Sequence, residues 1–447
     1  MNTVIKHVEK HRALILGTMD HIWKHPETGY KEWNTHKYLA DIFRNLGYTL
    51  TEAGNIPGFI TEVDTGRPGP TVGVFGEMDG LVIPGHPECD PQTGAVHACG
   101  HCAQVAALVG IAAALKEPGA LDGLCGKIRL IAVPAEELIE IEYRQALRKQ
   151  GIIRFFGGKQ EFIYRGLLDG VDLSFMVHTS PIGKHTARCI PGSNGFLSKT
   201  VTFEGVAAHA GGNPHLGVNA LYAANAALSM INNLRETFQD EDHIRVHPII
   251  TGGGDAVNTI PDKVTMESFI RGANVQAIAN ANRKVNRALA ASAAGMGANV
   301  RITDLPGHLP RIHKQDFIDV FSQAAKGVGI HFEDGAGSWS AACSDMGDVS
   351  NLMPGLHPSI GGTAGTEHAV DFVIDHPETA CVDSAKMQVA AIRLLLQEDA
   401  ARARAIVDAY EPTFPNKEAY LAFWDSADMD KYAVQYQDGK IILDFEK

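Results

Sequence analysis

Two short runs of this 447-residue sequence concentrate side chains of the kinds that bind transition metals. One runs from His97 to Cys102 (His-Ala-Cys-Gly-His-Cys), and the other from Pro134 to Glu137 (Pro-Ala-Glu-Glu). Zinc, manganese and cobalt ions accept thiolate, imidazole and carboxylate ligands, and a catalytic ion keeps one position open for the water that it acidifies. The two runs therefore predict a metal-dependent hydrolase.

Three predicted strands bring these side chains to one edge of a sheet. Residues 71–76 form an apolar segment followed by Asp79, and residues 127–133 form a second one that stops before Pro134. Residues 172–177 form a third, which leads directly into His178. In open α/β sheets, ligands bind in the crevice at the carboxyl ends of the strands. We therefore expect the candidate ligands to converge at that edge.

The first ligand run lies at the start of a predicted helix. Residues 103–115 are small and apolar, broken only by Gln104, which predicts a buried helix. Gly100 allows a turn that directs Cys99 and His101 toward one ion or toward two neighbouring ions. The helix N-terminus is also expected to lower the pKa of the Cys99 thiol.

At this point the chain resembles the aminoacylase and carboxypeptidase-G family of dinuclear metallohydrolases, peptidase family M20. The branch that it resembles most contains the indole-acetyl-amino-acid hydrolases and the aminobenzoyl-glutamate hydrolases. The motifs that carry the resemblance span nearly the whole chain and lie at residues 25–30, 97–101, 134–137, 205–210, 258–261 and 365–368.

The resemblance implies a role for each residue of a two-metal site. The metal ligands would be Cys99, His101, Glu137, His178 and His368. Glu136 would be the general base that passes a proton from a metal-bridging water to the leaving nitrogen, and Asp79 would orient a ligand. The metal ions would be one or two divalent Mn, Zn or Co ions per subunit.

The resemblance also implies substrate-binding residues in a smaller domain. His209 would stabilise the tetrahedral oxyanion, in the family often from the partner subunit. Asn258 and Arg271 occupy positions that resemble the family's anchors for a substrate carboxylate.

The chain departs from the family pattern at two places. The commoner pattern has Asp and His where this chain has Cys102 and Gln104, which changes the surroundings of the metal ligands. The glycine-rich stretch that commonly follows the glutamate pair is replaced by residues 138–144, a charged helical segment and then residues 155–160. A remodelled wall beside Glu136 suggests an unusual substrate.

Three alternatives to amide hydrolysis stay open on the sequence alone. One is hydrolytic deamination of an aromatic amine such as a nitroanthranilate, favoured by the altered wall. A second is thiol-disulfide exchange, because Cys99 and Cys102 have the spacing of a redox pair at a helix N-terminus. A third is a non-catalytic metal-binding or scaffold protein, which would leave Glu136 without a purpose.

The order of predicted elements indicates an α/β fold with an inserted domain. Residues 1–191 and 307–447 are expected to form a catalytic metal-binding domain around a mostly parallel sheet. Residues 192–306 follow the order strand, helix, two strands, helix, strand, which is the ferredoxin-like split unit. By resemblance this α+β domain forms a lid and the dimer contact.

Composition agrees with a cytoplasmic enzyme that acts on small molecules. A formal net charge of -13 disfavours nucleic-acid binding, and no apolar run is long enough to predict a membrane span. An odd count of seven cysteines and an N-terminus without an apolar signal core favour a reducing compartment. We expect a small-molecule substrate and a homodimer or higher homo-oligomer.

Overall fold

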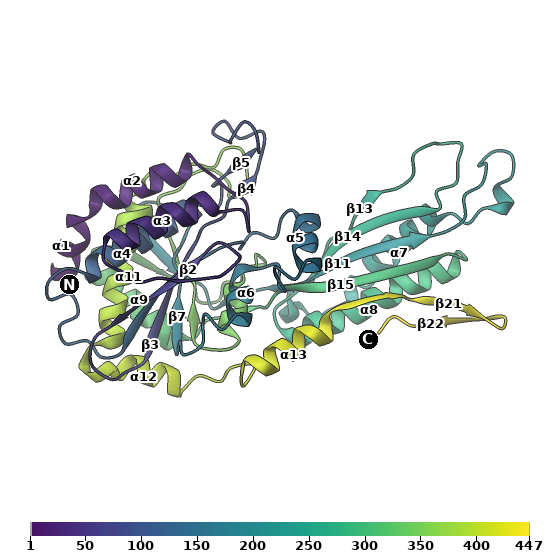
Figure 1. The fold of residues 1–447 in the computed structure, drawn as a ribbon. Coiled ribbons are helices and arrows are strands. Elements are labelled where there is room, and N and C mark those ends of the chain that lie inside the picture. The colour runs from purple at the N-terminus through teal and green to yellow at the C-terminus, as the bar shows by residue number, and fades with distance from the viewer. Residues whose placement is uncertain (1, 447) are drawn as a thin grey trace. The chain divides into compact units, whose positions relative to one another are not determined.

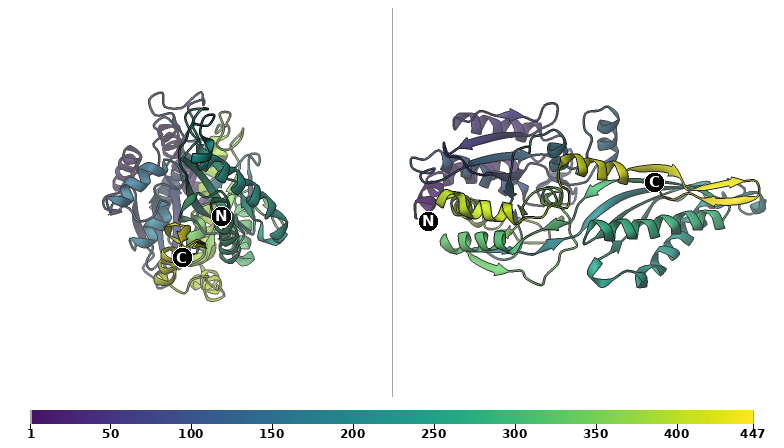
Figure 2. Two further views of the ribbon diagram at one scale, coloured as in Figure 1. Left: turned by 90° about the vertical axis from the view of Figure 1, so that its right-hand side faces the viewer. Right: turned by 90° about the horizontal axis from the view of Figure 1, so that it is seen from below.

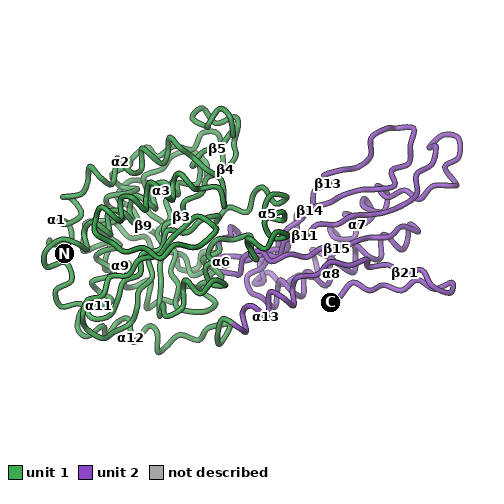
Figure 3. The backbone as a smooth tube through the Cα atoms, viewed as in Figure 1, with its two compact units in different colours: residues 1–192, 311–339, 345–417 green, residues 193–310, 340–344, 418–447 purple. Residues whose placement is uncertain are grey.

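The computed structural model describes residues 2–446, which divide into two compact units (Figure 3). Unit 1 comprises residues 2–192, 311–339 and 345–417, and unit 2 comprises residues 193–310, 340–344 and 418–446. Residues 307–447 were predicted to belong to the catalytic domain. In the structure, residues 307–310, 340–344 and 418–446 pack with unit 2 instead.

Unit 1 is built around a mixed sheet whose central strands are parallel (Figure 1). Its order is β1-β2-β6-β3-β7-β18. The strands are β1 Thr51–Glu52, β2 Phe59–Asp64, β3 Thr71–Glu77, β6 Lys127–Val133, β7 Leu173–Phe175 and β18 Gly355–Leu356. Parallel pairs join β3 to β6 and to β7, whereas β2 runs antiparallel to β6. Every residue of β3 is buried, as expected for a strand covered on both faces.

Helices cover this sheet, and one of them carries part of the candidate site. All fifteen residues of α4 (His101–Leu115) are buried, and α4 packs directly on β3. A helix that is apolar all round belongs in a core, as the sequence predicted. The other helices of unit 1 are α1 Asn2–Lys10, α2 Arg12–Trp23, α3 Trp33–Asn45, α5 Ile141–Lys149, α6 Gly158–Tyr164, α9 Gln315–Gly327, α10 Met346–Ser350, α11 Ser384–Leu396 and α12 Ala401–Asp408.

A second, smaller sheet in unit 1 has the order β17-β9-β19-β8. Its strands are β17 His331–Asp334, β9 Thr186–Cys189, β19 Ser359–Ile360 and β8 His178–Thr179. The pair β4 Leu81–Val82 and β5 Ala95–Val96 closes the loop between β3 and α4. The candidate ligand His178 is thus the first residue of β8, and only Met176 and Val177 separate it from the end of β7.

Unit 2 follows the predicted order of strands and helices, except that three strands rather than two lie between its helices, because the strand predicted over residues 244–251 is divided into two. Its elements are β11 Gly195–Glu204, α7 Ala220–Asn233, β12 Arg245–Val246, β13 Ile249–Gly252, β14 Lys263–Gly272, α8 Val275–Gly295 and β15 Asn299–His308. β11 lies between β14 and β15, antiparallel to both. Both α7 and α8 pack against β11 and against each other (Figure 2).

The tail adds elements to unit 2 that the sequence analysis did not predict. Helix α13 (Lys417–Ala427) leads into β20 (Met429–Tyr432), which pairs antiparallel with the edge strand β15. The hairpin of β21 (Val434–Gln437) and β22 (Lys440–Leu443) follows. The predicted fold class, an α/β unit with a mostly parallel sheet and an inserted α+β unit, is confirmed. None of the helices within residues 2–446 is long and apolar enough to cross a membrane.

Candidate metal centre

The candidate ligands of unit 1 come from ends of strands and from the start of a helix. Asp79 follows β3, the Glu136 and Glu137 pair follows β6, and His178 begins β8. Ala135 has a φ of 56°, a left-handed conformation that non-glycine residues rarely adopt. Its N–H donates to Oε1 of the buried Glu32 at 2.8 Å, which holds this turn in place. Strained backbone at such a position is typical of functional sites.

Two groups of three ligand atoms share the thiol of Cys99. The Cys99 Sγ lies 3.3 Å from His178 Nε2 and 3.4 Å from His368 Nε2. Cys99, His101 and His178 form one group, and Cys99, Glu137 and His368 form the other, each with its ligand atoms within 4.8 Å of one another. Each group could hold a divalent ion, and Cys99 would contribute to both groups.

The histidine rings are oriented so that Nε2 faces the shared cysteine. The Nδ1 of His101 lies 2.9 Å from the Asp79 carbonyl oxygen and 3.1 Å from Asp79 Oδ1. The Nδ1 of His178 lies 2.5 Å from the Thr179 carbonyl oxygen. Acceptors at both Nδ1 atoms fix the tautomer that protonates Nδ1 and leaves the Nε2 lone pair for a metal.

Asp79 also holds the second glutamate. The fully buried Asp79 accepts the backbone N–H of Glu137 at 2.9 Å through Oδ2. His101 Nε2 and Glu137 Oε1 are both buried and, within residues 2–446, make no well-aligned hydrogen bond, although they lie 3.2 Å from Glu77 Oε2 and from His368 Nε2, respectively. Buried polar atoms are normally hydrogen-bonded, so this pair fits atoms that await a metal ion.

Burial and mutual repulsion disfavour the ionised forms of the acidic side chains in this cluster. Burial, together with Glu77, Glu137 and Asp345, raises the pKa of Glu136 well above its usual value. Burial and the Glu137 carboxylate likewise raise the pKa of the Cys99 thiol well above its usual value. The expected lowering of that pKa was therefore wrong for the metal-free protein, because desolvation and the neighbouring Glu137 carboxylate raise it.

The dithiol alternative finds little support in the geometry. Cys102 is fully buried, and burial raises the pKa of its thiol to about 12. The cysteines of this chain, all of which the structure describes, are free thiols. A redox cysteine needs an accessible, low-pKa thiol, which neither Cys99 nor Cys102 offers.

Sequence reasoning missed a buried cation beside the site. The Lys159 ammonium contacts Glu77 Oε1 and Asp345 Oδ1, and the Lys159 N–H donates to Asp345 Oδ2 at 2.8 Å. All three side chains are buried, and carboxylate atoms of Glu77, Asp345 and Glu136 lie within 4.8 Å of one another. The run Gly-Gly-Lys-Gln at residues 157–160, flanked by aromatic residues, was the available signal.

Gln104, one of the departures from the family pattern, hydrogen-bonds to a member of the same cluster. Gln104 Nε2 donates to Glu77 Oε2 at 2.9 Å, and that oxygen also lies 3.2 Å from His101 Nε2. The amide, the ammonium of Lys159 and the imidazole therefore all face one carboxylate. Burial alone would raise the pKa of Glu77, but the neighbouring Lys159 and His101 outweigh burial and lower it.

The remodelled wall after the glutamate pair forms helices α5 and α6. Fully buried Arg144 donates to the carbonyl oxygens of Phe156, at 2.6 Å, and of Glu137. The Tyr30 hydroxyl donates to the Phe155 carbonyl at 2.9 Å, and the guanidinium of Arg144 lies 5.6 Å from the centre of the Tyr30 ring. Arg144 thus fixes the backbone on the C-terminal side of the glutamate pair.

The three other predicted site residues belong to unit 2. His209 forms a β-bridge with Thr259, and the N–H of Ala210 donates to the Asn258 carbonyl at 2.9 Å, so His209 and Asn258 lie on adjacent segments. His209 is exposed, and its Nδ1 accepts the N–H of Gly212 at 2.9 Å. This bond places the proton on Nε2.

Arg271 lies apart on β14, with different neighbours. Its Nη1 lies 2.9 Å from Cys343 Sγ and 3.3 Å from the Ala341 carbonyl. Its guanidinium also lies 5.3 Å from the ring centres of Phe196 and of Phe269. Its role as a carboxylate anchor stays a prediction.

Comparisons with known proteins agree with this geometry. Residues 192–296 match the peptidase dimerisation domain of the M20 family. The Xaa-Arg dipeptidase of Mus musculus is 28% identical over 369 residues, covering 78% of this chain and 77% of the relative. The chain is therefore similar to M20 peptidases in its dimerisation domain and to a dipeptidase over most of its length. The predicted resemblance is thereby confirmed.

Two further M20 relatives extend the comparison. A p-aminobenzoyl-glutamate hydrolase chain of Escherichia coli (strain K12) is 28% identical over 274 residues, covering 59% of this chain and 52% of the relative. A dinuclear metal-binding peptidase of the M20 family from Bacillus subtilis has a similar fold, with a TM-score of 0.67 and 21% identity. That match covers 87% of this chain and 99% of the other.

Proposed function

We propose that this protein is a two-metal amidohydrolase that cleaves the amide bond of an N-acyl amino acid, a dipeptide or an aryl amide. The observation that carries the proposal is the pair of ligand groups that share Cys99, with Glu136 adjacent to both. Bound divalent ions would polarise the scissile carbonyl and acidify a water molecule. Mn, Zn and Co all suit this mixture of sulfur, nitrogen and oxygen ligands.

Glu136 is the proposed general base of this reaction. Its carboxylate belongs to a group with His101 and Glu137, which places it beside proposed ligands of both ions. It would accept a proton from the attacking water and pass it to the leaving nitrogen. Asp79, which holds both His101 and Glu137, would keep these ligands in their productive orientation.

His209 is the proposed donor to the oxyanion. Because Nδ1 accepts a backbone N–H, the proton on Nε2 is available for a hydrogen bond to the developing negative charge. Asn258 on the neighbouring segment and Arg271 are the proposed anchors for a substrate carboxylate. Such anchors suit amides whose amine half is an amino acid.

The domains have separate proposed roles. Unit 1 would hold the metal ions, and unit 2 would form the lid and the contact of a homodimer, because its residues 192–296 match a dimerisation domain. Two relatives are named for a dipeptide and for p-aminobenzoyl-glutamate, which supports a small amide as substrate.

One observation favours a second candidate, the hydrolytic deamination of an aromatic amine. Helices α5 and α6, with buried Arg144 and Lys159, form a wall beside Glu136 that differs from the family's glycine-rich stretch. In that reaction water attacks a ring carbon and ammonia leaves, so the products distinguish the two candidates.

The test is a product assay on purified protein loaded with manganese or zinc. The panel contains N-acyl amino acids, dipeptides, p-aminobenzoyl-glutamate and substituted anthranilates, and Glu136→Ala serves as the control. We expect release of a free amino acid or carboxylic acid that Glu136→Ala abolishes. Ammonia from an anthranilate would establish deamination instead, and no turnover by a protein with full metal content would refute both candidates.

A further inference from the structure

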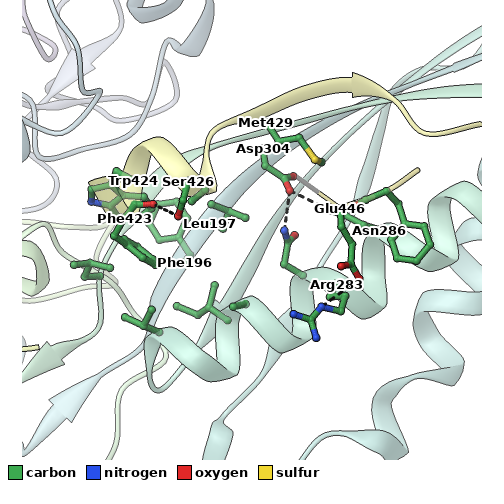
Figure 4. A pocket seen from close by; sticks show the side chains of 17 residues that line it. Phe196, Leu197, Arg283, Asn286, Asp304, Phe423, Trp424, Ser426, Met429 and Glu446 are labelled. Carbon is green, nitrogen blue, oxygen red and sulfur yellow. Dashed lines mark hydrogen bonds and ion pairs between the residues drawn. The ribbon is translucent and has the colours of Figure 1, made fainter. Parts of the chain in front are cut away.

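Unit 2 contains a cavity of about 260 Å³ that no proposed step of the amide hydrolysis uses. Helix α8 and strands β11 and β15 form one side, and the tail forms the other through α13, β20 and the last described residues. Figure 4 shows three labelled aromatic side chains at one end, and charged or amide side chains at the other, where a further aromatic ring also lies. The aromatic end contains Phe196, Phe423 and Trp424, and the polar end contains Arg283, Asn286, Asp304 and Glu446.

Asp304, at the floor of the polar end, belongs to a buried ion pair. Lys199 on β11 and Asp304 on β15 are directly opposite each other in the sheet, and each is 2% exposed. The Lys199 ammonium contacts Asp304 Oδ1 and lies 2.6 Å from Asn286 Oδ1. A buried ion pair gains the fold little stability over apolar residues of similar volume. Asp304 nevertheless keeps a carboxylate at the wall of the cavity, where a ligand can meet it.

The polar end also has an acceptor that is left unpaired. Asn282 Nδ2 donates to Asp304 Oδ2 at 2.7 Å, while Asn282 Oδ1 is buried and has no hydrogen-bond partner among the residues that the structure describes. Both atoms belong to a side chain that lines the cavity. A ligand with N–H donors would satisfy this oxygen.

An exposed ion pair lies next to these groups. Arg283 Nε is 3.3 Å from Glu446 Oε1, and the two side chains are 62% and 58% exposed. Exposed pairs contribute little stability and rearrange readily. Arg283 can therefore exchange Glu446 for a carboxylate that enters the cavity, through two parallel hydrogen bonds.

We propose that this cavity binds an apolar α-amino acid as its zwitterion. The ammonium group would bind Asn282 Oδ1, close to the negative charge of Asp304, whose Oδ2 already accepts N–H groups of Asn282 and Asn286 at 2.7 and 3.2 Å. The carboxylate would bind Arg283. The apolar side chain would lie between Phe196, Phe423 and Trp424 at the other end. The floor is electrically balanced by Lys199, so a neutral zwitterion adds no net charge to a buried site.

The proposed ligand belongs to the same class as one product of amide hydrolysis. If the proposed function holds, occupancy of this cavity would report the concentration of free amino acid. That connection rests on the proposed function, whereas binding itself does not require turnover.

Isothermal titration calorimetry of the metal-loaded full chain with L-phenylalanine tests the proposal. Ala279→Phe fills the cavity, because Ala279 lines it from α8, and Asn282→Leu removes the unpaired acceptor. Asn280→Phe is the matched control, since Asn280 is exposed on the same helix and does not line the cavity. We expect Ala279→Phe and Asn282→Leu each to weaken binding at least about tenfold, and Asn280→Phe to change it less than about twofold.

Two compounds test the ligand class. 2-Phenylethylamine lacks the carboxylate and 3-phenylpropanoate lacks the ammonium, so we expect each to bind at least about tenfold more weakly than L-phenylalanine. Equal binding of all three would overturn the zwitterion assignment. L-Phenylalanine binding that neither cavity variant weakens would lie elsewhere, for instance at the metal centre, and would overturn the site, as would no binding to the wild-type protein. Each result is independent of whether the protein hydrolyses any amide.

Discussion

Replacing Lys159 with Met removes the ammonium group that lies between two buried carboxylates. Met preserves most of the volume of the side chain, so the loss of charge dominates. Lys159 and Asp345 are 0% exposed in their side chains and Glu77 is 1% exposed, so water cannot replace the missing cation. Breaking a buried ion pair by removing one partner costs about 3–5 kcal/mol. At about 2–3 °C per kcal/mol for a unit of this size, the melting temperature should fall by about 6–15 °C.

The loss should also depend on pH. Burial already raises the pKa of Asp345 to about 6, although Lys159 opposes that rise. Without Lys159 this pKa rises further, and a carboxyl group with a raised folded-state pKa contributes stability that is present at low pH and lost as pH increases through that value. The destabilisation by Lys159→Met should therefore be smaller at pH 5.5 than at pH 8.

Thermal unfolding at these two pH values measures both effects. Lys127→Met is the matched control, because Lys127 pairs with Glu62 at 2.7 Å but is 42% exposed, and it should cost less than about 1 kcal/mol. The double variant Lys159→Met/Asp345→Asn removes one charge of each sign and should recover part of the loss. A loss for Lys159→Met that equals the Lys127→Met loss, or that grows as pH falls, would refute the reasoning.

Three further predictions concern the proposed chemistry. Glu136→Gln should lower kcat by about 10²–10⁴-fold and leave the metal content unchanged. The control variant Glu142→Gln, on the exposed face of α5, should retain activity. If Glu136→Gln loses metal, Glu136 is a metal ligand, and its assignment as a base alone is wrong. The raised pKa keeps Cys99 a protonated thiol in the metal-free protein, so metal binding should release at least about one proton. Metal affinity should therefore increase as pH rises from 6 to 8. Calorimetry in buffers of different ionisation enthalpy would measure the proton release, and Cys99→Ser should reduce it. His209→Ala should lower kcat by about 10²–10³-fold and leave the metal content unchanged. His215→Ala is the control, because His215 is also exposed. Equal effects of the two substitutions on kcat would argue against an oxyanion role for His209.

The sequence predicted the parts of the site that depend on local patterns. Apolar runs that end in Asp79, in Glu136 and Glu137, and in His178 placed these residues at strand ends, because parallel strands share one carboxyl edge. The motif resemblance added His368, which no local pattern could have connected to Cys99 across 269 positions.

Interactions between segments that are far apart in the chain could not be predicted from the sequence. Asp345 is 186 residues from Lys159, and nothing in the periodicity of either segment predicts their contact. The pairing of β20 with β15 brings Asp430 opposite Thr303, far along the chain, so the tail could not be assigned to unit 2. Desolvation is another property of the whole fold, which is why the direction of the Cys99 pKa was wrong.

Two of the residues that depart from the family pattern, Gln104 and Lys159, lie in one cluster of contacting, charge-balancing side chains. Gln104 stands where the commoner pattern has His, and it donates to Glu77 instead of offering another titratable group. Glu77 in turn lies beside His101 Nε2, where a bare carboxylate could compete for the ion that His101 is proposed to bind. The ammonium of Lys159 binds the other oxygen of Glu77 and neutralises it. The replacement at position 104, the lysine of the remodelled segment and the buried Asp345 thus form a single charge-balanced unit, so reverting Gln104 to His alone should disturb the site rather than restore a family-like one.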